Sequence, residues 1–396
     1  MRRASRGRSG SARGLRESRE PILIFLATRA ALFLLAYLSL AVLPLNPDPS
    51  VATPAGGPWR GFPTNLWLDG WARWDAGWYE HIAKHGYVDQ AVGPSGQRNL
   101  AFYPLYPLTM WILSLAGPEP LLAGILISNL ALLAALLLIH RMARARFGVE
   151  AASRCVLLMS VFPFSFYFSA VYSESLFLLL AVAALFLGER GQWAGASVCA
   201  LLCGATRAPG LALAPTLGLL YLERIRYDLR KLRPDVLWLG IAVLGPFLFY
   251  ADLNVQFGDP WLAFKATRVP GWWQGGFDLR PAERAIRALR SVENLRTGQF
   301  PVVFDLNLLA AALCFGTLVA VFRRQPLAWG VFALLIVASG VLQPGGWGRY
   351  VLPAFPVFLA WALALEGRLA LAAVTALSTL LLALLTILYT HWYWVS

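Results

Sequence analysis

One short segment of the chain brings together an acid, several bases and a series of tryptophans. Residues 71–87 read Trp-Ala-Arg-Trp-Asp-Ala-Gly-Trp-Tyr-Glu-His-Ile-Ala-Lys-His-Gly-Tyr, and they follow the first long apolar run. Each residue of an α-helix advances by about 100°, so a helix here would carry an aromatic and imidazole stripe along one side. The stripe consists of Trp71, Trp74, Trp78, His81 and His85. Because indole is apolar in its body and polar at its tip, the stripe predicts a helix lying in the head-group plane of a membrane.

Asp75 is the candidate general base on this helix. It lies about a quarter turn from the stripe, and the two indoles beside it favour partial desolvation of its carboxylate. Asp69 precedes the helix and is interpreted as its N-cap. A purely structural alternative pairs Asp75 with Arg73 or Lys84 on an amphipathic helix that does no chemistry.

A metal site on the same helix is a weaker interpretation. His81 and His85 are four residues apart, so their imidazoles could ligate one ion from the same face. Two imidazoles alone are a weak signal, and the chain has only two further histidines, His140 and His391. We therefore assign no metal ligands; no cofactor is certain, and a divalent metal is possible but not indicated by the residues.

The composition indicates that lipid surrounds much of the chain. Hydrophobic residues make up 58% of the 396 residues and charged residues 14%, and the mean hydropathy is +0.59. Soluble domains are on average about a quarter charged. Apolar runs of about 17 to 23 residues recur and match the hydrocarbon core of a bilayer. The sequence predicts an all-α, multi-pass membrane protein whose partners include membrane lipids.

The basic residues predict the topology of this membrane protein. Their net charge of +13 is explained by clusters between apolar runs, so no nucleic-acid partner is expected. Because Lys and Arg concentrate in cytoplasmic loops, residues 1–20, with seven Arg, are expected to be a disordered cytoplasmic tail. Residues 21–396 are then one polytopic catalytic domain. Its extracytoplasmic loops are expected at 44–120 and 253–300.

Counting crossings between the basic clusters predicts about eleven spans. The apolar stretch 102–117 is excluded from this count and interpreted as interfacial or re-entrant, because the prolines of Phe102-Tyr-Pro-Leu-Tyr-Pro107 break a regular helix entry. Residues 194–222 begin and end beside basic residues and are expected to form two short helices that turn near residues 207–210. The expected spans are 22–43, 121–139, 153–171, 175–188, the two helices of 194–222, 235–252, 301–322, 327–343, 350–366 and 369–390.

This topology places four ionisable residues near the outer face although they are far apart in sequence. They are Asp75, Glu174, Arg207 and Arg349. Ionisable groups at or within a membrane are costly and usually face a partner or a cavity, so their convergence predicts a site on that side. In the alternative, each of the four merely anchors a helix end at the head groups.

Several motifs resemble those of a known family. The string Arg73-Trp74-Asp75-Ala76-Gly77-Trp78-Tyr79 resembles the signature of the PIG-V-type mannosyltransferases. This family belongs to the GT-C glycosyltransferases, which are multi-pass enzymes that use polyprenyl-phosphate sugars. Further similar blocks, in order, are Phe102–Pro107, Phe166–Leu176 with its Tyr172-Ser173-Glu174, Ala205-Thr206-Arg207 and Arg349-Tyr350-Val-Leu-Pro353. The resemblance covers most of the chain from residue 22.

The resemblance implies an activity and roles for particular residues. The donor would be polyprenyl-phosphate mannose, the acceptor a lipid-linked or other glycan, and Asp75 the catalytic base on the extracytoplasmic side. Arg207 and Arg349 would bind the donor phosphate through charge-assisted hydrogen bonds. The remaining candidates, which would bind or orient substrate, are Arg73, Tyr79, Tyr172 and Glu174. Direct displacement at the anomeric carbon would invert its configuration.

Two other classes of function share some of these features. A lipid-sugar flippase or transporter would have the same apolar spans and outer charges, but transporters often carry internal repeats and broken helices at mid-membrane. No repeat is evident here, and the ionisable residues are expected near one face. A scaffold subunit is the third class. In the second outer loop, Trp261, Trp272, Trp273 and Lys265 are expected either to cover the donor or to form a membrane-surface belt.

Overall fold

The computed structural model describes residues 19–47, 59–93, 96–267, 302–341 and 346–395, and all regular secondary structure in these ranges is helical. The predicted all-α class is therefore confirmed. Residues 1–18 of the predicted tail and residues 268–300 of the predicted second loop lie outside the described ranges. The helices, with 3₁₀ helices marked η, are α2 Arg19–Val42, α3 Leu66–Asp69, α4 Asp75–His85, η1 Asn99–Ala101, α5 Leu105–Ser114, α6 Pro120–Val161, η2 Ser165–Phe168, α7 Glu174–Glu189, α8 Trp193–Thr206, η3 Ala208–Ala212, α9 Leu213–Arg224, η4 Leu229–Lys231, η5 Pro234–Val243, α10 Leu244–Phe257, α11 Leu262–Ala266, α13 Val302–Arg324, α14 Leu327–Val341, α15 Trp347–Tyr350, α16 Phe355–Ala364 and α17 Arg368–Thr390.

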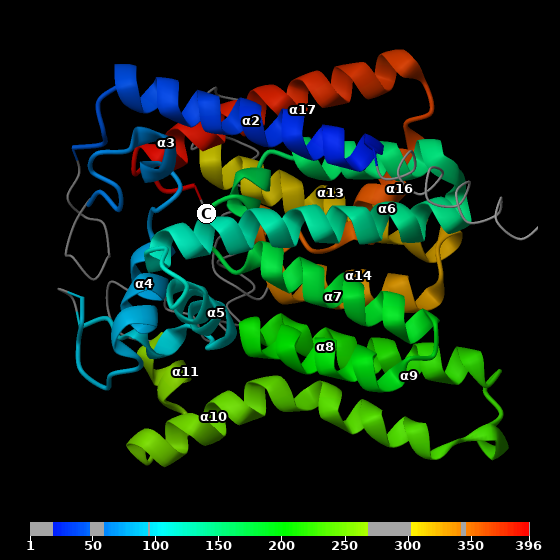
Figure 1. Ribbon diagram of the computed structural model, residues 1–396. Coiled ribbons are helices and arrows are strands. Elements are labelled where there is room, and N and C mark those ends of the chain that lie inside the picture. Colours follow the sequence, from blue (N-terminus) through cyan, green and yellow to red (C-terminus); the bar gives the residue numbers. More distant parts are fainter. Residues whose placement is uncertain (1–18, 48–58, 94–95, 268–301, 342–345, 396) are drawn as a thin grey trace, which may run out of the picture.

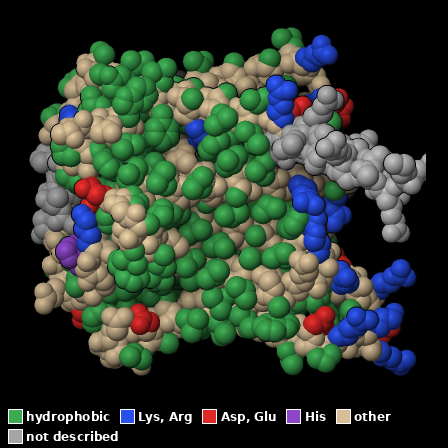
Figure 2. All heavy atoms as spheres, in the orientation of Figure 1, with side chains coloured by type: hydrophobic (Ala, Val, Ile, Leu, Met, Phe, Trp, Pro, Cys, Tyr) green, Lys and Arg blue, Asp and Glu red, His purple; other side chains and the backbone are tan. Residues whose placement is uncertain are grey.

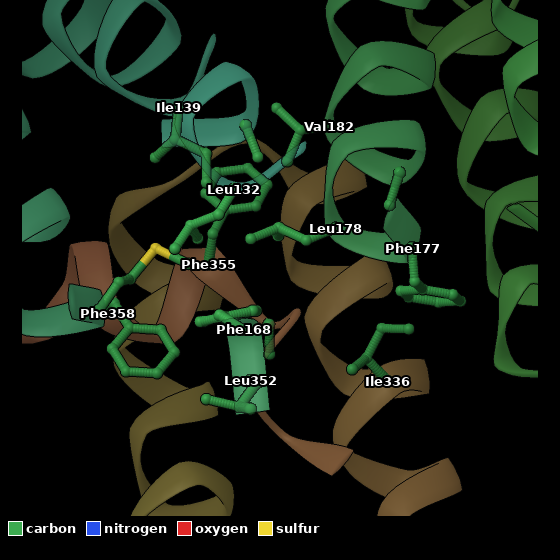
Figure 3. Packing of buried hydrophobic residues seen from close by; sticks show 14 of the residues in the cluster. Leu132, Ile139, Phe168, Phe177, Leu178, Val182, Ile336, Leu352, Phe355 and Phe358 are labelled. Atoms are coloured by element: carbon green, nitrogen blue, oxygen red, sulfur yellow. The ribbon is translucent and has the colours of Figure 1, made fainter. Parts of the chain in front are cut away.

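Most of the long helices run side by side between two ends of the molecule, and the short helices α3, α4, α5 and α11 gather at one of these ends (Figure 1). Side chains of α6, α7, α14 and α16 meet in the apolar core, as Figure 3 shows. On the face that Figure 2 shows, the surface between the two ends is largely apolar. An apolar belt between polar ends is what a surrounding bilayer requires.

Five helices among the described residues are long and apolar enough to cross a membrane. They are α2, α6, the joined helix Pro234–Phe257, the Leu306–Arg324 part of α13, and α17. The helices α5, α8, α14 and α16 are apolar but have only 10 to 17 residues. A helix needs about 20 residues to cross the hydrocarbon core, and all four of these helices are shorter, so length alone does not separate α5 from the others. The interfacial interpretation of 102–117 stays a prediction. The total of about eleven crossings stays a prediction.

The range of α6 contains a turn at Gly148, where φ is 87° and ψ is 169°. His140 Nε2 lies 3.3 Å from Ser153 Oγ across this turn. In a continuous helix, thirteen residues would separate these positions by about 20 Å, so the two parts of α6 fold back on each other. Glycine is the residue suited to this left-handed backbone conformation, because it has no Cβ.

The second part of α6 ends at Val161, ten residues before the predicted end of the span 153–171, and that boundary was therefore wrong. Phe162 precedes Pro163, and the residue before a proline disfavours the helical conformation. Residues 162–173 instead form turns around η2 before α7 begins.

Arg29, buried in the middle of α2, provides hydrogen bonds at this break. Its Nη2 donates to the carbonyl of Ser160 at 2.7 Å, and its Nη1 donates to the carbonyl of Ser165 at 3.1 Å. Nη1 also lies 3.3 Å from Ser169 Oγ. The last carbonyls of a helix have no intrahelical donor and carry partial negative charge, so a guanidinium stabilises them.

Residues 194–222 form two short helices, as predicted. α8 ends at Thr206, the η3 turn follows, and α9 begins at Leu213. Arg207 precedes η3, with φ of −163° and ψ of 146°. Its extended backbone directs the chain away from the axis of α8.

Contacts between helix ends show which of these ends lie on the same side of the molecule. At the basic end, Glu189 at the last position of α7 accepts hydrogen bonds from Arg146 at 3.1 Å and from Trp329 at 2.8 Å. At the other end, His391 Nε2 after α17 lies 3.2 Å from the carbonyl oxygen of Ser39 in α2. These pairings agree with the sides assigned from the sequence. Lys and Arg side chains gather at one end of the molecule in Figure 2.

Candidate active site

The four predicted ionisable residues meet in one chain of alternating charges. Arg349 Nη1 donates to Asp75 Oδ2 at 2.8 Å, and Arg349 Nε donates to Glu174 Oε1. Arg207 Nη1 donates to the same oxygen of Glu174. The order is therefore Asp75, Arg349, Glu174 and Arg207, contributed by the beginnings of α4 and α7, the residue after α8, and α15.

The two ends of this chain are the accessible parts. The side chains of Asp75 and Arg207 retain 15% and 14% exposure, while those of Arg349 and Glu174 retain 6% and 0%. Oδ1 of Asp75 makes no hydrogen bond with any described residue. A free carboxylate oxygen therefore lies at one end of the chain and a partly exposed guanidinium at the other. The structural alternative that paired Asp75 with Arg73 or Lys84 is wrong.

Glu174, which the sequence places near the outer face, is fully buried. Both arginines donate to its Oε1, and Oε2 has no hydrogen-bond partner among the described residues. A buried ion pair is favourable only where close contacts replace the lost hydration. The two guanidinium groups provide that replacement on one oxygen only.

Aromatic rings surround the guanidinium groups. Arg349 lies 4.4 Å from the ring centroid of Tyr172 and 5.2 Å from that of Tyr167. Arg207 lies 4.8 Å from the ring of Tyr350. A guanidinium over an aromatic face gains electrostatic attraction, particularly where water is excluded. The rings thus hold both cations in place without neutralising their charge.

Tyr79 and Tyr172 connect the charged chain to the surrounding helices. The Tyr79 hydroxyl donates to Ser173 Oγ at 3.2 Å, and the Asp75 backbone N–H donates to the Tyr172 hydroxyl at 3.3 Å. Burial, together with the carboxylates of Glu174 and Asp75, raises the pKa of Tyr79 above its ordinary value. Tyr79 therefore keeps its proton at neutral pH and acts as a hydrogen-bond donor.

The backbone before Asp75 is strained. Trp74 has φ of 53° and ψ of −112°, a conformation that costs a bulky residue about 1–3 kcal/mol. Its ring is held by Trp392 at 5.5 Å and Trp394 at 4.9 Å between centroids. α4 begins at the next residue, Asp75, so the carboxylate lies at the positive end of the helix dipole.

Arg73 is buried and does not contact Asp75. It forms an ion pair with Asp69 at 2.7 Å and donates from Nε to the carbonyl of Thr390 at 2.8 Å. These bonds attach the turn before α4 to the end of α17. The interpretation of Asp69 as the N-cap of the catalytic helix is wrong, because Asp69 ends α3 and the N-cap position of α4 is Trp74.

The expected tryptophan stripe is not at a membrane surface. Trp71 and Trp78 are buried inside the protein, and α4 begins four residues after Trp71. Trp71 stacks on Phe33 of α2, and Trp78 stacks on Phe102. The packing of α2 and of the first loop around α4 explains this correction, since neighbouring elements rather than lipid cover the indoles.

The histidines of α4 lie on its outer side. Their ring centroids are 5.0 Å apart, and His81 Nδ1 lies 3.1 Å from the amide nitrogen of Asn99, so this nitrogen accepts. Burial and the neighbouring imidazole of His85 lower the pKa of His81. No group of three or more His, Cys, Asp or Glu able to hold a metal occurs in the described ranges.

Sequence reasoning missed the residues that position Arg349. The backbone N–H of Gly348 donates to Asn307 Oδ1 at 2.8 Å, which connects α15 to α13. A Cβ at Gly348 would lie 2.2 Å from the ring of Phe164. The sequence does place Gly348 beside Arg349 in a glycine-rich turn, but nothing in it indicates which ring approaches that glycine.

The fold defines the class of protein. It is the fold of the GT-C membrane glycosyltransferases: the structure matches the crystal structure of ArnT from Cupriavidus metallidurans bound to undecaprenyl phosphate with a TM-score of 0.51 and 15% identity. The match covers 88% of this chain and 61% of ArnT. The apo structure of the same protein gives the same TM-score over 89% of this chain.

The sequence matches a narrower group. The family model described as mannosyltransferase (PIG-V) matches residues 61–257, a range that contains Asp75, Glu174 and Arg207 but not Arg349. The GPI alpha-1,6-mannosyltransferase 2 of Mus musculus is 31% identical over 222 residues, and that of Rattus norvegicus is 32% identical over 160 residues. Residues 61–257 thus match the PIG-V-type mannosyltransferase family.

These alignments cover part of each protein. The mouse alignment covers 49% of this chain and 42% of the mouse protein, and the rat alignment covers 36% and 30%. The chain thus matches less than half the length of these curated relatives.

Proposed function

We propose that the protein is an inverting glycosyltransferase that moves mannose from a polyprenyl-phosphate donor to an acceptor hydroxyl at the extracytoplasmic membrane face. The observation that carries the proposal is the position of Asp75. Its carboxylate is held by Arg349 through Oδ2, retains 15% exposure, and leaves Oδ1 without a partner among the described residues. The match of residues 61–257 to a mannosyltransferase family model supports the choice of mannose.

Asp75 is the proposed base in this reaction. The acceptor hydroxyl forms a bond to the anomeric carbon while its proton passes to Asp75 Oδ1. The bond from that carbon to the phosphate oxygen breaks, and its electron pair leaves with the phosphate. Attack opposite the leaving group inverts the anomeric centre, so a β-linked donor gives an α-glycoside. General-base assistance is typically worth about 10²- to 10⁴-fold in rate.

Arg207 is the proposed partner of the leaving phosphate. It is the more exposed of the two arginines, and among the described residues its one side-chain hydrogen bond is that of Nη1 to Glu174. The departing polyprenyl phosphate gains negative charge, which remaining N–H donors of a guanidinium stabilise through charge-assisted hydrogen bonds. We assign Arg349 the role of fixing the positions of the Asp75 and Glu174 carboxylates, which it contacts.

The distribution of basic residues supports an extracytoplasmic site. Arg190, Arg224, the pair Arg323-Arg324, and Arg368 lie at the helix ends opposite Asp75. Lys and Arg concentrate on the cytoplasmic side of membrane proteins, so the end bearing Asp75 is assigned to the other side.

Activity of the purified protein tests this proposal. In detergent, with labelled polyprenyl-phosphate mannose and a panel of lipid-linked, glycolipid and peptide acceptors, we expect sugar transfer to the acceptor. We expect Asp75→Asn to reduce the transfer rate at least about 10²-fold, because the amide cannot take the proton. Asp89→Asn is the matched control: Asp89 is a 42% exposed carboxylate of the same loop, paired with Arg98. Its rate should stay within about two-fold of the unsubstituted protein.

Two results would count against the proposal. Transfer that continues at the unsubstituted rate in Asp75→Asn would remove Asp75 from the mechanism. Movement of intact donor between the leaflets of a vesicle, without transfer to any acceptor, would instead support a flippase.

A further inference from the structure

Glu174 is the most buried member of the charged chain and the only one shared by both arginines. Its side chain is fully buried, and a single oxygen, Oε1, receives Arg349 Nε and Arg207 Nη1. The second oxygen, Oε2, is buried without a hydrogen-bond partner in the described parts of the chain.

Burying the Glu174 carboxylate in this way costs free energy that holding an arginine in place does not require. A buried acceptor without a donor loses its hydration and gains nothing in return. A carboxylate also binds guanidinium most strongly when both of its oxygens accept, which Glu174 does with neither arginine. Its contact with Arg207 is therefore made through a single N–H, to an oxygen that Arg349 already engages.

The two arginines differ in how firmly they are held. Arg349 also binds Asp75 at 2.8 Å and lies 4.4 Å from the Tyr172 ring, and it is 6% exposed. Arg207 is 14% exposed and has one ionic partner in the described ranges, Glu174. Of the two, Arg207 is the cation that can change its partner without dismantling the site.

We propose that Glu174 is an internal competitor of the donor phosphate: the carboxylate and the phosphate are alternative partners of Arg207. This inference rests on the proposed function and assigns Glu174 the role of a positioning residue. When a phosphate takes Arg207, Glu174 Oε1 is left with Arg349 alone, and the Arg349–Glu174 bond strengthens. When the product phosphate leaves, Glu174 regains Arg207.

The exchange makes the binding of polyprenyl phosphate weaker than the site could provide, which favours product release. The net charge of the four side chains explains why the phosphate binds more weakly. Asp75, Glu174, Arg207 and Arg349 together carry no net charge, so an added phosphate makes the cluster negative. Removal of the Glu174 charge would make the cluster positive and leave Arg207 without a competing anion.

Binding of a short-chain polyprenyl phosphate in detergent, measured by calorimetric titration, tests the exchange. We expect Glu174→Gln to bind this probe about ten-fold or more tightly than the unsubstituted protein, since one charge-assisted contact no longer competes. Arg207→Gln should bind it more weakly. In the Arg207→Gln background, Glu174→Gln should have little further effect, because coupled residues give non-additive changes.

Glu189→Gln is the matched control. Glu189 is the last residue of the same helix, α7, and its carboxylate also pairs with an arginine, Arg146 at 3.1 Å, at the opposite end of the molecule. The Glu189→Gln variant should bind the probe with the affinity of the unsubstituted protein. Should Glu174→Gln fail to give a monodisperse protein, Glu174→Asp replaces it, because the shorter side chain withdraws the carboxylate from Arg207 and should shift the affinity in the same direction.

The possible failures are distinguishable. Equal or weaker binding by Glu174→Gln, in a protein that transfers sugar and binds the probe, would overturn the exchange and leave the glycosyltransferase proposal intact. A gain in affinity that persists in full without Arg207 would show a general charge effect and would also overturn it. Absence of both probe binding and transfer in the unsubstituted protein would remove the proposed function itself.

Discussion

At the scale of single residues, the site depends on pairings that bridge long stretches of chain. Asp75 and Arg349 are 274 positions apart, and Glu174 and Arg349 are 175 apart. Each ionisable side chain alone would be costly in an apolar protein, and the alternation of sign lets every charge contact its opposite. Small changes beside these residues should therefore affect activity through geometry.

Gly348→Ala tests how closely Arg349 is positioned. The added Cβ would lie 2.2 Å from the Phe164 ring, which is buried and has little space to move. We expect a loss of about 1–3 kcal/mol in the free energy of unfolding and a lower transfer rate, because α15 must shift. Thermal unfolding in detergent and a transfer assay at saturating donor provide the two measurements.

Gly316→Ala is the control for this substitution. No atom lies within 4 Å of a Cβ at Gly316, which is inside α13. Alanine is the better helix former, so we expect unchanged or slightly raised stability. Unaltered stability and activity in Gly348→Ala would show that Phe164 moves freely and that the close approach has no consequence.

At the scale of elements, the site is built where helices are interrupted. α6 ends before Pro163, α8 ends at Thr206, and α15 is a single turn of four residues. Tyr167, Tyr172 and Arg207 all lie in or beside these interruptions. Interruptions expose backbone polar groups, which must find partners when water is absent. Arg29 is the partner at one of them.

Arg29→Met should destabilise the protein. The substitution keeps most of the side-chain volume but removes the donors to the Ser160 and Ser165 carbonyls, which lie at 2.7 Å and 3.1 Å. Hydrogen bonds from a charged group are worth about 1.5–3 kcal/mol, so we expect a loss of at least that size in unfolding free energy. Transfer should also fall, because the same turn carries Tyr167.

Arg154→Met is the control for Arg29. Arg154 is 22% exposed and pairs at 3.2 Å with Glu150, whose side chain is 81% exposed. Exposed ion pairs contribute about 0–1 kcal/mol, so little change is expected. Equal stability of the two variants would mean that the carbonyls at the helix break do not need Arg29.

At the scale of the whole molecule, the two ends differ in charge and in chemistry. Basic side chains gather at one end (Figure 2), and the charged chain beside α4 lies at the other. A multi-pass protein cannot rotate within the bilayer to exchange its ends, because that would carry charged residues through hydrocarbon. The side of the active site is therefore a fixed property that labelling can measure.

Lys84→Cys and Lys231→Cys test the orientation. Lys84 is in α4 and its side chain is 47% exposed, while Lys231 is at the basic end and 60% exposed. In intact cells, a membrane-impermeant maleimide should label the cysteine at 84 and not the one at 231. The native Cys155, Cys203 and Cys314 are buried and Cys199 is half-buried, so background labelling should be low. The reverse pattern would place Asp75 on the cytoplasmic side.

The sequence predicted the general architecture well, because the features concerned are local or depend on the solvent. The α-helical class and the paired helices around residue 207 follow from run length and charge, and the structure agrees. The predictions that failed concern side chains covered by distant parts of the chain. Trp71 and Trp78 were placed at the membrane surface and are buried.

By itself, the sequence determined that the chain is a helical membrane protein, which helix ends share a side, and which motif holds the candidate base. Each of these follows from hydrophobicity and charge along short segments. Only the tertiary structure decided that Asp75 binds Arg349 and that one oxygen of Glu174 accepts from two arginines. It also decided that Arg73 forms its ion pair with Asp69. Ion-pair partners depend on which helices pack together and at what depth their turns meet, and no spacing within a single segment contains that information.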